Sequence, residues 1–267
     1  MADGNNTSRR SFLVRTGALA TTLGLVGCSD PSQSPWVLNI LGEVENLTRR
    51  AQRLFAGGHA LAPEYSKADI APQFRANGTL NPSTNDYTAH MASGFKDWIV
   101  RVDGLVERPL KLSIADIRAM PSRTQITRHD CVEGWSCIGE WTGTQLALVL
   151  AMARPKDNAR YVVFHCADPW GEATMDGNGN IIQPPYYYES LDLLEATHPQ
   201  IILAYKLNGE TLPVEHGAPV RLRAERQLGY KMPKYVQRIE LTDTFARIGG
   251  GKGGYWEDQG YQWYGGI

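Results

Sequence analysis

The stretch that decides the fold is Arg128-His129-Asp130-Cys131-Val132-Glu133-Gly134-Trp135, followed by Trp141-Thr142-Gly143. Residues 124–129 have the alternating pattern of a strand, and we expect Cys131 to lie on a polar loop that leads into a helix. A free cysteine is most often a small buried hydrophobic residue. The loop position and the neighbouring Arg128 and His129 instead favour a thiolate that is presented to a metal or a substrate.

The N-terminus has the features of an export signal. Ser8-Arg9-Arg10-Ser11-Phe12-Leu13 predicts the twin-arginine route to the bacterial periplasm. A short run of small apolar residues ends in Leu25-Val26-Gly27-Cys28, which resembles a lipobox and predicts a lipid anchor at Cys28. An ordinary cleaved signal is the alternative. We therefore expect a signal and linker over residues 1–35 and a catalytic domain over residues 36–267.

The composition bounds the remaining possibilities. The chain has 267 residues, of which 42% are hydrophobic, and its net charge is -1. A substantial core is possible, in one compact domain or two small ones. The near-neutral charge gives no indication of nucleic-acid binding. The sequence has no apolar run of the roughly 20 residues that a bilayer-spanning helix needs.

The chain alternates short strands and short helices without a regular βαβ rhythm, which favours an α+β fold. We expect strands over residues 98–104, 161–164, 201–205, 220–223 and 236–241, and helices over 113–120, 144–152 and 190–197. Asn208-Gly209 predicts a tight turn. Residues 36–95 are expected to be irregular, and the tail is expected to be flexible over 249–254 before its aromatic residues dock on the domain.

Two further clusters could carry chemistry. A basic run stands out in a nearly neutral chain and comprises Arg221, Arg223, Arg226, Lys231 and Lys234. Together with backbone amides it predicts a phosphate site, although a solvated strand face is the alternative. An aromatic cluster comprises Trp170, Tyr186, Tyr187, Tyr188 and Glu189. Such residues usually pack in a core, but a phenol beside a metal can relay a proton.

Several sequence blocks occur together in one order: Cys131-Val132-Glu133-Gly134-Trp135, Trp141-Thr142-Gly143, Tyr187-Tyr188-Glu189-Ser190, His198-Pro199-Gln200, His216-Gly217-Ala218-Pro219-Val220-Arg221-Leu222-Arg223 and Gly229-Tyr230-Lys231-Met232-Pro233-Lys234. From about Tyr65 to Leu241 the chain thereby resembles the sulfite oxidase family of molybdenum enzymes. The resemblance implies a mixed-sheet molybdopterin-binding domain, without an added haem or dimerisation domain.

The resemblance also implies roles for individual residues. Cys131 would be the protein ligand of molybdenum, Tyr187 would be the active-site tyrosine, and Glu133 is a third catalytic candidate. The cofactor would be molybdenum–molybdopterin without a required nucleotide. Its expected binding residues are Asn77, Gly78, Cys131, His165, Cys166, His216, Arg221, Met232, Pro233 and Lys234.

Departures from the family pattern bear on the substrate. Sulfite oxidases follow the cysteine with small residues and an arginine, whereas this chain has Glu133, which would repel a sulfite dianion. The layout is more similar to periplasmic protein-methionine-sulfoxide reductase subunits, which receive electrons from a membrane cytochrome. One difference from them is His216, where they have asparagine. We therefore expect reduction of an S-oxide or N-oxide, either a small molecule or protein methionine sulfoxide.

Two alternatives to this function stay open. The enzymatic one is oxidation of sulfite. The non-enzymatic one is a lipoprotein with a structural zinc ion, which would draw its ligands from His129, Cys131, Cys137, His165 and Cys166.

Overall fold

The computed structural model describes residues 44, 47–51, 60–171, 173–178 and 180–267. The expected export signal, Cys28 and the expected domain boundary at residue 35 lie outside these residues. Thr48–Ile267 forms a compact unit that contains the structure discussed below. Among the described residues, no helix combines the length and the apolar character needed to cross a membrane.

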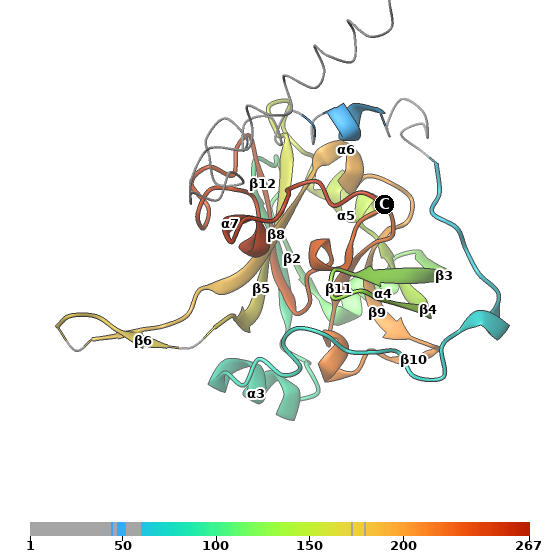
Figure 1. Ribbon diagram of the computed structural model, residues 1–267, viewed down its shortest axis with the longest axis horizontal. Coiled ribbons are helices and arrows are strands. Elements are labelled where there is room, and N and C mark those ends of the chain that lie inside the picture. Colours follow the sequence, from blue (N-terminus) through green and yellow to red (C-terminus); the bar gives the residue numbers. More distant parts are fainter. Residues whose placement is uncertain (1–43, 45–46, 52–59, 172, 179) are drawn as a thin grey trace, which may run out of the picture. The chain divides into compact units, whose positions relative to one another are not determined.

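One sheet of this unit is mixed (Figure 1). Its strand order is β2 (Leu110–Ser113), β1 (Ile99–Gly104), β12 (Val236–Thr242), β5 (Tyr161–Pro169) and β8 (Tyr186–Asp192). Strands β1 and β12 are parallel, and the other pairs are antiparallel. Three of these strands confirm the expected positions near residues 98–104, 161–164 and 236–241.

A second sheet is antiparallel. Its order is β10 (Glu210–Thr211), β9 (Ile201–Leu207), β4 (Trp135–Gln145) and β3 (Ser122–Cys131), and β11 (Arg221–Ala224) also pairs with β9. The tight turn at Asn208-Gly209 joins β9 to β10, as the sequence predicts. A small separate hairpin is formed by β6 (Thr174–Met175) and β7 (Ile181–Ile182), and it extends away from the sheets (Figure 1).

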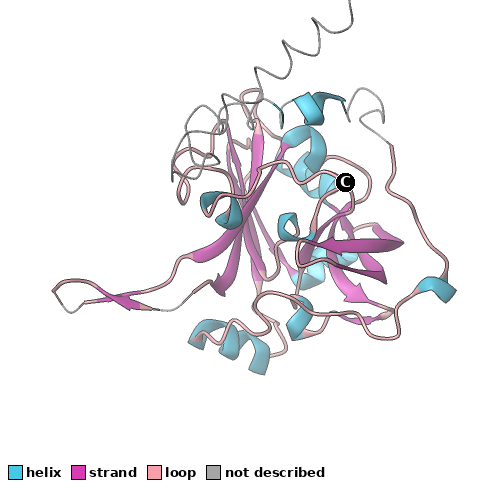
Figure 2. Ribbon diagram, viewed as in Figure 1, coloured by secondary structure: helices cyan, strands magenta, loops and turns pink. Residues whose placement is uncertain are grey.

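The helices are short and lie around the sheets (Figure 2). They are α3 (Asn85–Ala92), α4 (Ile114–Ala119), α5 (Leu146–Ala153), α6 (Leu193–Ala196) and α7 (Tyr255–Asp258), with 3-10 turns η2 (Lys67–Asp69), η3 (Val214–His216) and η4 (Gly229–Lys231). Helix α4 begins at a capping box, within the range expected for a helix. The Ser113 hydroxyl accepts from the Asp116 amide, and the Asp116 carboxylate accepts from the Ser113 amide.

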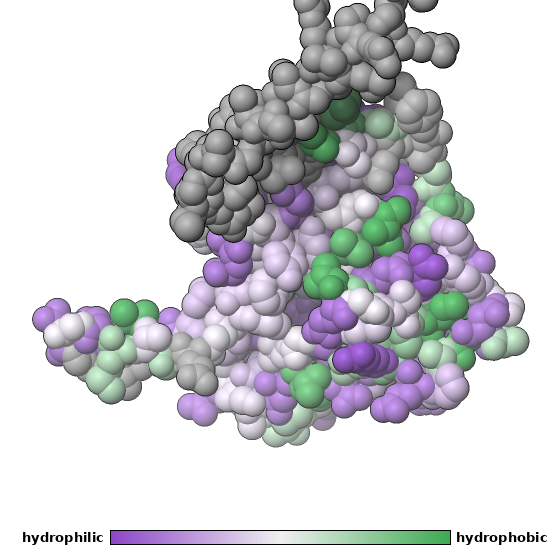
Figure 3. Space-filling model, viewed as in Figure 1, coloured by the Kyte–Doolittle hydropathy of each residue, from purple (hydrophilic) through white to green (hydrophobic). Residues whose placement is uncertain are grey.

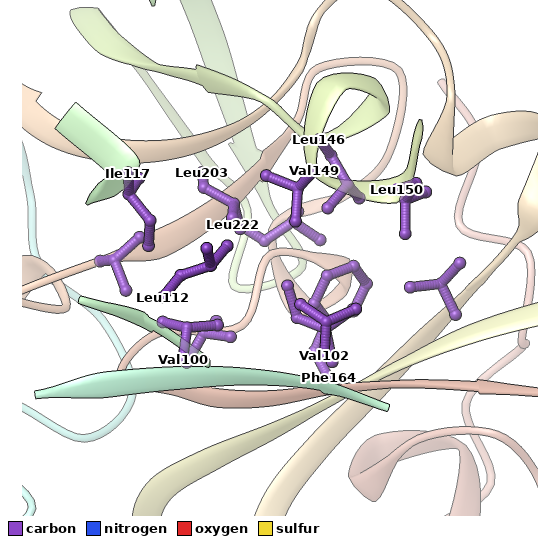
Figure 4. Close-up of a cluster of buried hydrophobic side chains, with 14 of the residues drawn as sticks. Val100, Val102, Leu112, Ile117, Leu146, Val149, Leu150, Phe164, Leu203 and Leu222 are labelled. Carbon is purple, nitrogen blue, oxygen red and sulfur yellow. The ribbon is translucent and has the colours of Figure 1, made fainter. Parts of the chain in front are cut away.

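The main core lies where the two sheets and α5 meet. Val100, Val102 and Phe164 come from the mixed sheet and face Leu203 and Leu222 of the other sheet (Figure 4). Leu146, Val149 and Leu150 of α5 complete this cluster. The outer surface mixes polar and apolar residues over the face drawn in Figure 3. The α+β class with a mixed sheet is confirmed.

Several local predictions are wrong. No helix follows Cys131, because residues 132–134 form a tight turn between β3 and β4. The expected helix over 190–197 is shorter than predicted, because residues 190–192 belong to strand β8 and the helix covers Leu193–Ala196. Within 36–95, the segment Asn85–Ala92 is a helix that begins at Thr84, whose side chain accepts from the Tyr87 amide.

Candidate active site

Cys131 is the last residue of β3, where the ladder to β4 ends. Strands β3 and β4 are paired from Ser122↔Thr144 to Cys131↔Trp135, so three residues close the hairpin. Gly134 has φ +84°, a left-handed conformation that glycine adopts without strain, and its amide donates to the Cys131 carbonyl at 3.0 Å. The Cys131 side chain is therefore fixed by sheet geometry at the base of an exposed turn.

The Cys131 thiol is shielded from solvent and has one polar side-chain partner. Cys131 is 8% exposed, and the Asn77 side-chain amide donates to the Cys131 sulfur at 3.6 Å. Burial raises the pKa of the Cys131 thiol. A metal bound at this sulfur would displace the proton, since the thiolate is the ligating form.

Glu133 lies on the turn and is held at the rim. Its Oε2 accepts from the Trp135 indole nitrogen at 2.8 Å and lies 3.9 Å from an Arg75 guanidinium nitrogen. That guanidinium also lies 4.9 Å from the centroid of the Trp135 ring. Arg75 therefore offsets the Glu133 charge, and the electrostatic repulsion of an anion expected from Glu133 alone is weakened.

A pocket opens beside the Cys131 sulfur. It holds about 820 Å³ of empty space, including the part open to solvent. Its lining comprises Asn77, Gly78, Cys131, Val132, Glu133, Asp168, Trp170, Tyr187, Arg221, Gly229, Tyr230, Met232, Pro233, Lys234, Trp256 and Tyr261. The structure thus brings most of the sequence-predicted site residues together around one cavity.

Two buried cations line this pocket without a carboxylate within salt-bridge distance among the described residues. Arg221 is 3% exposed and donates to the carbonyls of His216 and Met232, both at 3.0 Å. Lys234 is 8% exposed and donates to the carbonyls of Asn77, at 2.7 Å, and of Glu215 and Thr79. Burial, reinforced by mutual repulsion, lowers the pKa of Lys234 to about 7, and burial with the nearby Arg223 charge lowers the pKa of Arg221 to about 9. A bound anion would therefore stabilise the charged form of both side chains.

The other members of the basic run have carboxylate partners. Arg223 makes a two-point contact with Glu225, at 3.0 and 2.6 Å, and both side chains are fully buried. Arg226 contacts Glu195 at 2.6 Å. Lys231 lies between Glu189 and Glu257 and is 2.6 Å from the latter. The alternative of a solvated strand face is wrong for these residues, and Arg221 and Lys234 differ from the rest by their unneutralised charge.

Tyr187 and Asp168 contribute a phenol and a carboxyl group to the same lining. The Tyr187 hydroxyl donates to the Tyr230 carbonyl at 2.7 Å, and burial raises the pKa of Tyr187. Asp168 is 2% exposed, and its Oδ1 has no hydrogen-bond partner. Burial raises the pKa of Asp168 to about 6. An acceptor without a partner at this position suits a ligand that carries N–H donors.

Three residues of the expected cofactor set do not line the pocket. His165 lies on β5, where its Nε2 is 2.8 Å from Glu240. Cys166 is 3% exposed and pairs with Val236 of the neighbouring strand. His216 is 5% exposed and packs its ring 5.6 Å from that of Phe74, while its carbonyl accepts from Arg221. His216 therefore helps to hold Arg221, which lines the pocket, although His216 does not line it.

The structure does not assemble the alternative zinc site. Within the described ranges, no group of three or more His, Cys, Asp or Glu side chains could hold a metal ion together. Cys131 and Cys137, six residues apart in the sequence, are both free cysteines and form no disulfide. Cys137 lies instead in a small apolar cluster with Phe74 and Trp141.

The residues present fit the molybdenum–pterin group that the sequence resemblance implies. Cys131 offers a sulfur ligand, and Arg221 and Lys234 offer cations for a phosphate. Asp168 offers an acceptor to the nitrogen-bound hydrogens of a pterin ring. These four groups surround one cavity, and within the described part of the chain none of them has a partner of opposite charge at salt-bridge distance.

Sequence reasoning missed part of the lining. Asp168 follows the apolar residues of β5, and a polar residue at the end of a buried strand is a signal that could have found it. Trp256 and Tyr261 come from the tail, and Gly229 and Tyr230 come from η4. Their place in the pocket depends on long-range packing, which has no local pattern.

Comparisons with known proteins identify the family of this chain. The family model of the oxidoreductase molybdopterin binding domain matches residues 88–247. A putative protein-methionine-sulfoxide reductase subunit, YedZ1, from Azospira oryzae is 34% identical over 259 residues, which cover 97% of this chain and 88% of that protein. Among solved structures, the sulfane dehydrogenase SoxCD from Paracoccus pantotrophus aligns with a TM-score of 0.46 and 24% identity. That alignment covers 56% of this chain, which spans 39% of the SoxCD chain.

Proposed function

Because this chain belongs to the family of oxidoreductases with a molybdopterin-binding domain, we propose that it reduces neutral S-oxides or N-oxides at a molybdenum–pterin centre. Cys131 ligates the metal, and Arg221 and Lys234 neutralise the pterin phosphate. The observation that carries the proposal is the presence of two buried cations without carboxylate partners in salt-bridge range, among the described residues, in the same pocket as a buried thiol.

The division of labour follows from the residues present. When bound, the molybdenum–pterin group supplies the redox chemistry of oxygen-atom transfer, while the protein supplies ligation and electrostatics. Asn77 contacts the Cys131 sulfur and helps to orient it. Tyr187, through its bond to the Tyr230 carbonyl, fixes η4 against the pocket. Reduction of an S-oxide to a sulfide and water consumes two electrons and two protons, and the electrons come from a separate donor.

The choice of a neutral oxide rests on the lining around the cations. Aromatic rings of Trp170, Tyr230, Trp256 and Tyr261 suit apolar substituents on a substrate. The similarity to a putative protein-methionine-sulfoxide reductase subunit supports an S-oxide, either free or within a protein. A membrane cytochrome as electron donor, export to the periplasm through the twin-arginine signal and a lipid anchor at Cys28 complete the proposal.

Oxidation of sulfite is the second candidate, because one observation favours it. Arg75 lies 3.9 Å from Glu133, which lines the pocket, and its side chain is 62% exposed, so a cation is available to an oxyanion near Glu133. The two candidates differ in the direction of electron flow and in the charge of the substrate.

One experiment separates them. Purified, molybdenum-loaded protein is assayed with reduced methyl viologen and either methyl p-tolyl sulfoxide or trimethylamine N-oxide, and in parallel with sulfite and ferricyanide. We expect viologen oxidation with the neutral oxides and little reduction of ferricyanide by sulfite. Robust sulfite oxidation without turnover of either oxide would refute the proposal. Metal analysis of the same sample, with Cys131→Ala as the control, distinguishes molybdenum from zinc.

A further inference from the structure

Part of the pocket wall comes from a segment beyond the matched domain. The family model ends at residue 247, whereas Trp256 and Tyr261 line the pocket. Both rings lie in the C-terminal segment Gly249–Ile267, which contains α7 and packs beside β8 (Figure 1). The pocket is therefore shaped partly by residues that the shared domain does not include.

The rings of this segment extend an aromatic surface along the pocket. Trp256 and Tyr261 are stacked, with centroids 5.1 Å apart and an interplanar angle of 28°. Tyr230 lies 5.3 Å from Tyr261, and Trp170 lies 5.6 Å from Trp256. Tyr261 is 39% exposed, so the surface is open to an incoming molecule.

Buried polar contacts fix the segment on both sides of these rings. Glu257 follows Trp256, is 1% exposed and pairs with Lys231 at 2.6 Å. The Tyr230 hydroxyl donates to the Gln262 carbonyl at 2.7 Å, and the Trp263 indole nitrogen donates to the Ser190 hydroxyl at 2.8 Å. Buried ion pairs contribute little net stability, so their effect here is to hold one geometry.

We propose that Gly249–Ile267 forms the subsite for the organic substituents of the oxide, with Trp256 and Tyr261 as its specificity-determining contacts. This inference rests on the proposed reduction of oxides. Ring faces carry negative electrostatic potential and do not attract an anion. They contact sulfur and apolar carbon favourably. The segment accordingly favours aryl or extended thioether oxides over small ones and over inorganic oxyanions.

The kinetic test uses the holoenzyme and two substrates with the same reacting group. Tyr261→Ala and Trp256→Leu are assayed with methyl p-tolyl sulfoxide and with dimethyl sulfoxide. We expect KM for the aryl substrate to rise about 5-fold or more, as loss of roughly 1 kcal/mol of ring contact predicts. The KM for dimethyl sulfoxide should rise by a clearly smaller factor than the KM for the aryl substrate. Tyr186→Ala is the matched control, because Tyr186 is 53% exposed and does not line this pocket.

A binding measurement keeps this inference separate from the proposed function. The holoenzyme is titrated with methyl p-tolyl sulfide, and binding is followed by tryptophan fluorescence. Binding by the parent protein that weakens in Tyr261→Ala, without turnover of any oxide, would support the subsite and refute oxide reduction. Turnover of oxides with equal effects of Tyr261→Ala on both substrates, or with no effect on either, would refute the subsite and leave oxide reduction standing.

Discussion

We expect Lys234 to make anion binding in the pocket depend on pH. In the cofactor-free protein, burial and the Arg221 charge lower the pKa of Lys234 from 10.5 to about 7. A lowered lysine pKa means that the neutral amine is favoured in the folded state, so its contribution to stability is present at high pH and is lost as pH falls through 7. A bound anion favours the ammonium form instead. Above pH 7, binding of an anion must therefore take up a proton.

The size of this effect follows from the protonated fraction. About half of Lys234 is charged at pH 7 and about 3% at pH 8.5, so the affinity for a dianion should fall about 16-fold, or about 1.6 kcal/mol. The charges of the neighbouring groups His216, Asp168 and Arg221 change little over this range. His216 has a pKa of about 4 and Asp168 of about 6, and Arg221 stays charged below about 9.

Calorimetric titration with sulfate measures this dependence, because the charge of sulfate is constant over this range. Cofactor-free protein is titrated at steps between pH 7 and 8.5, with Lys234→Met as the control. We expect the control to bind more weakly at pH 7 and to show no pH dependence. A flat profile in the parent protein, or an equal slope in Lys234→Met, would refute the assignment of Lys234 as an anion-binding cation.

Three further predictions concern single side chains. Cys131→Ala should abolish turnover and molybdenum retention while the fold survives, whereas Cys137→Ala should keep turnover and molybdenum. Metal analysis and activity assays of the two variants test this, and equal losses in both would contradict the ligand assignment. Arg221→Ala should weaken pterin retention roughly 10- to 150-fold, since a charge-assisted hydrogen bond contributes about 1.5–3 kcal/mol, and released pterin fluorescence measures the occupancy. Lys231→Met should lower the free energy of unfolding by about 3–5 kcal/mol, because it leaves two buried carboxylates side by side without a cation. Glu257→Gln should lower it by only about 1 kcal/mol. Denaturant titration measures both values, and a larger loss in Glu257→Gln would contradict the prediction.

The fold class was accessible from the sequence because burial imposes local periodicity. The strands near 98–104, 161–164, 201–205 and 236–241 confirm the expected ranges. The helix expected after Cys131 does not form, because Glu133-Gly134 closes a three-residue turn. The sequence of the strand that follows, β4, does not show a clear strand pattern of polar and apolar residues. Strand β8 continues past Ser190 because the C-terminal segment covers it at this point, where the Ser190 hydroxyl donates to the Gly253 carbonyl.

Site residues could be predicted only where residues that are adjacent in the sequence share a chemical character. The basic run pointed to an anion, but the sequence could not distinguish Arg221 and Lys234 from Arg223 and Lys231. That distinction depends on partners, since Lys231 meets carboxylates 42 and 26 residues away while Lys234 meets only carbonyl oxygens as hydrogen-bond acceptors in the described structure. Burial of a charge is a property of tertiary packing, and the same residue types serve both purposes.

The hairpin of β3 and β4 separates two properties that an evolving enzyme needs to change independently. Cys131 belongs to the ladder, whose ten paired positions set where its sulfur lies. Val132 and Glu133 belong to the exposed turn, which no strand pairing constrains. Substitutions at these two positions can therefore alter the charge and shape that a substrate meets at the rim while Cys131, the proposed metal ligand, keeps its place. The architecture thus leaves substrate preference open to variation and protects the ligand from it.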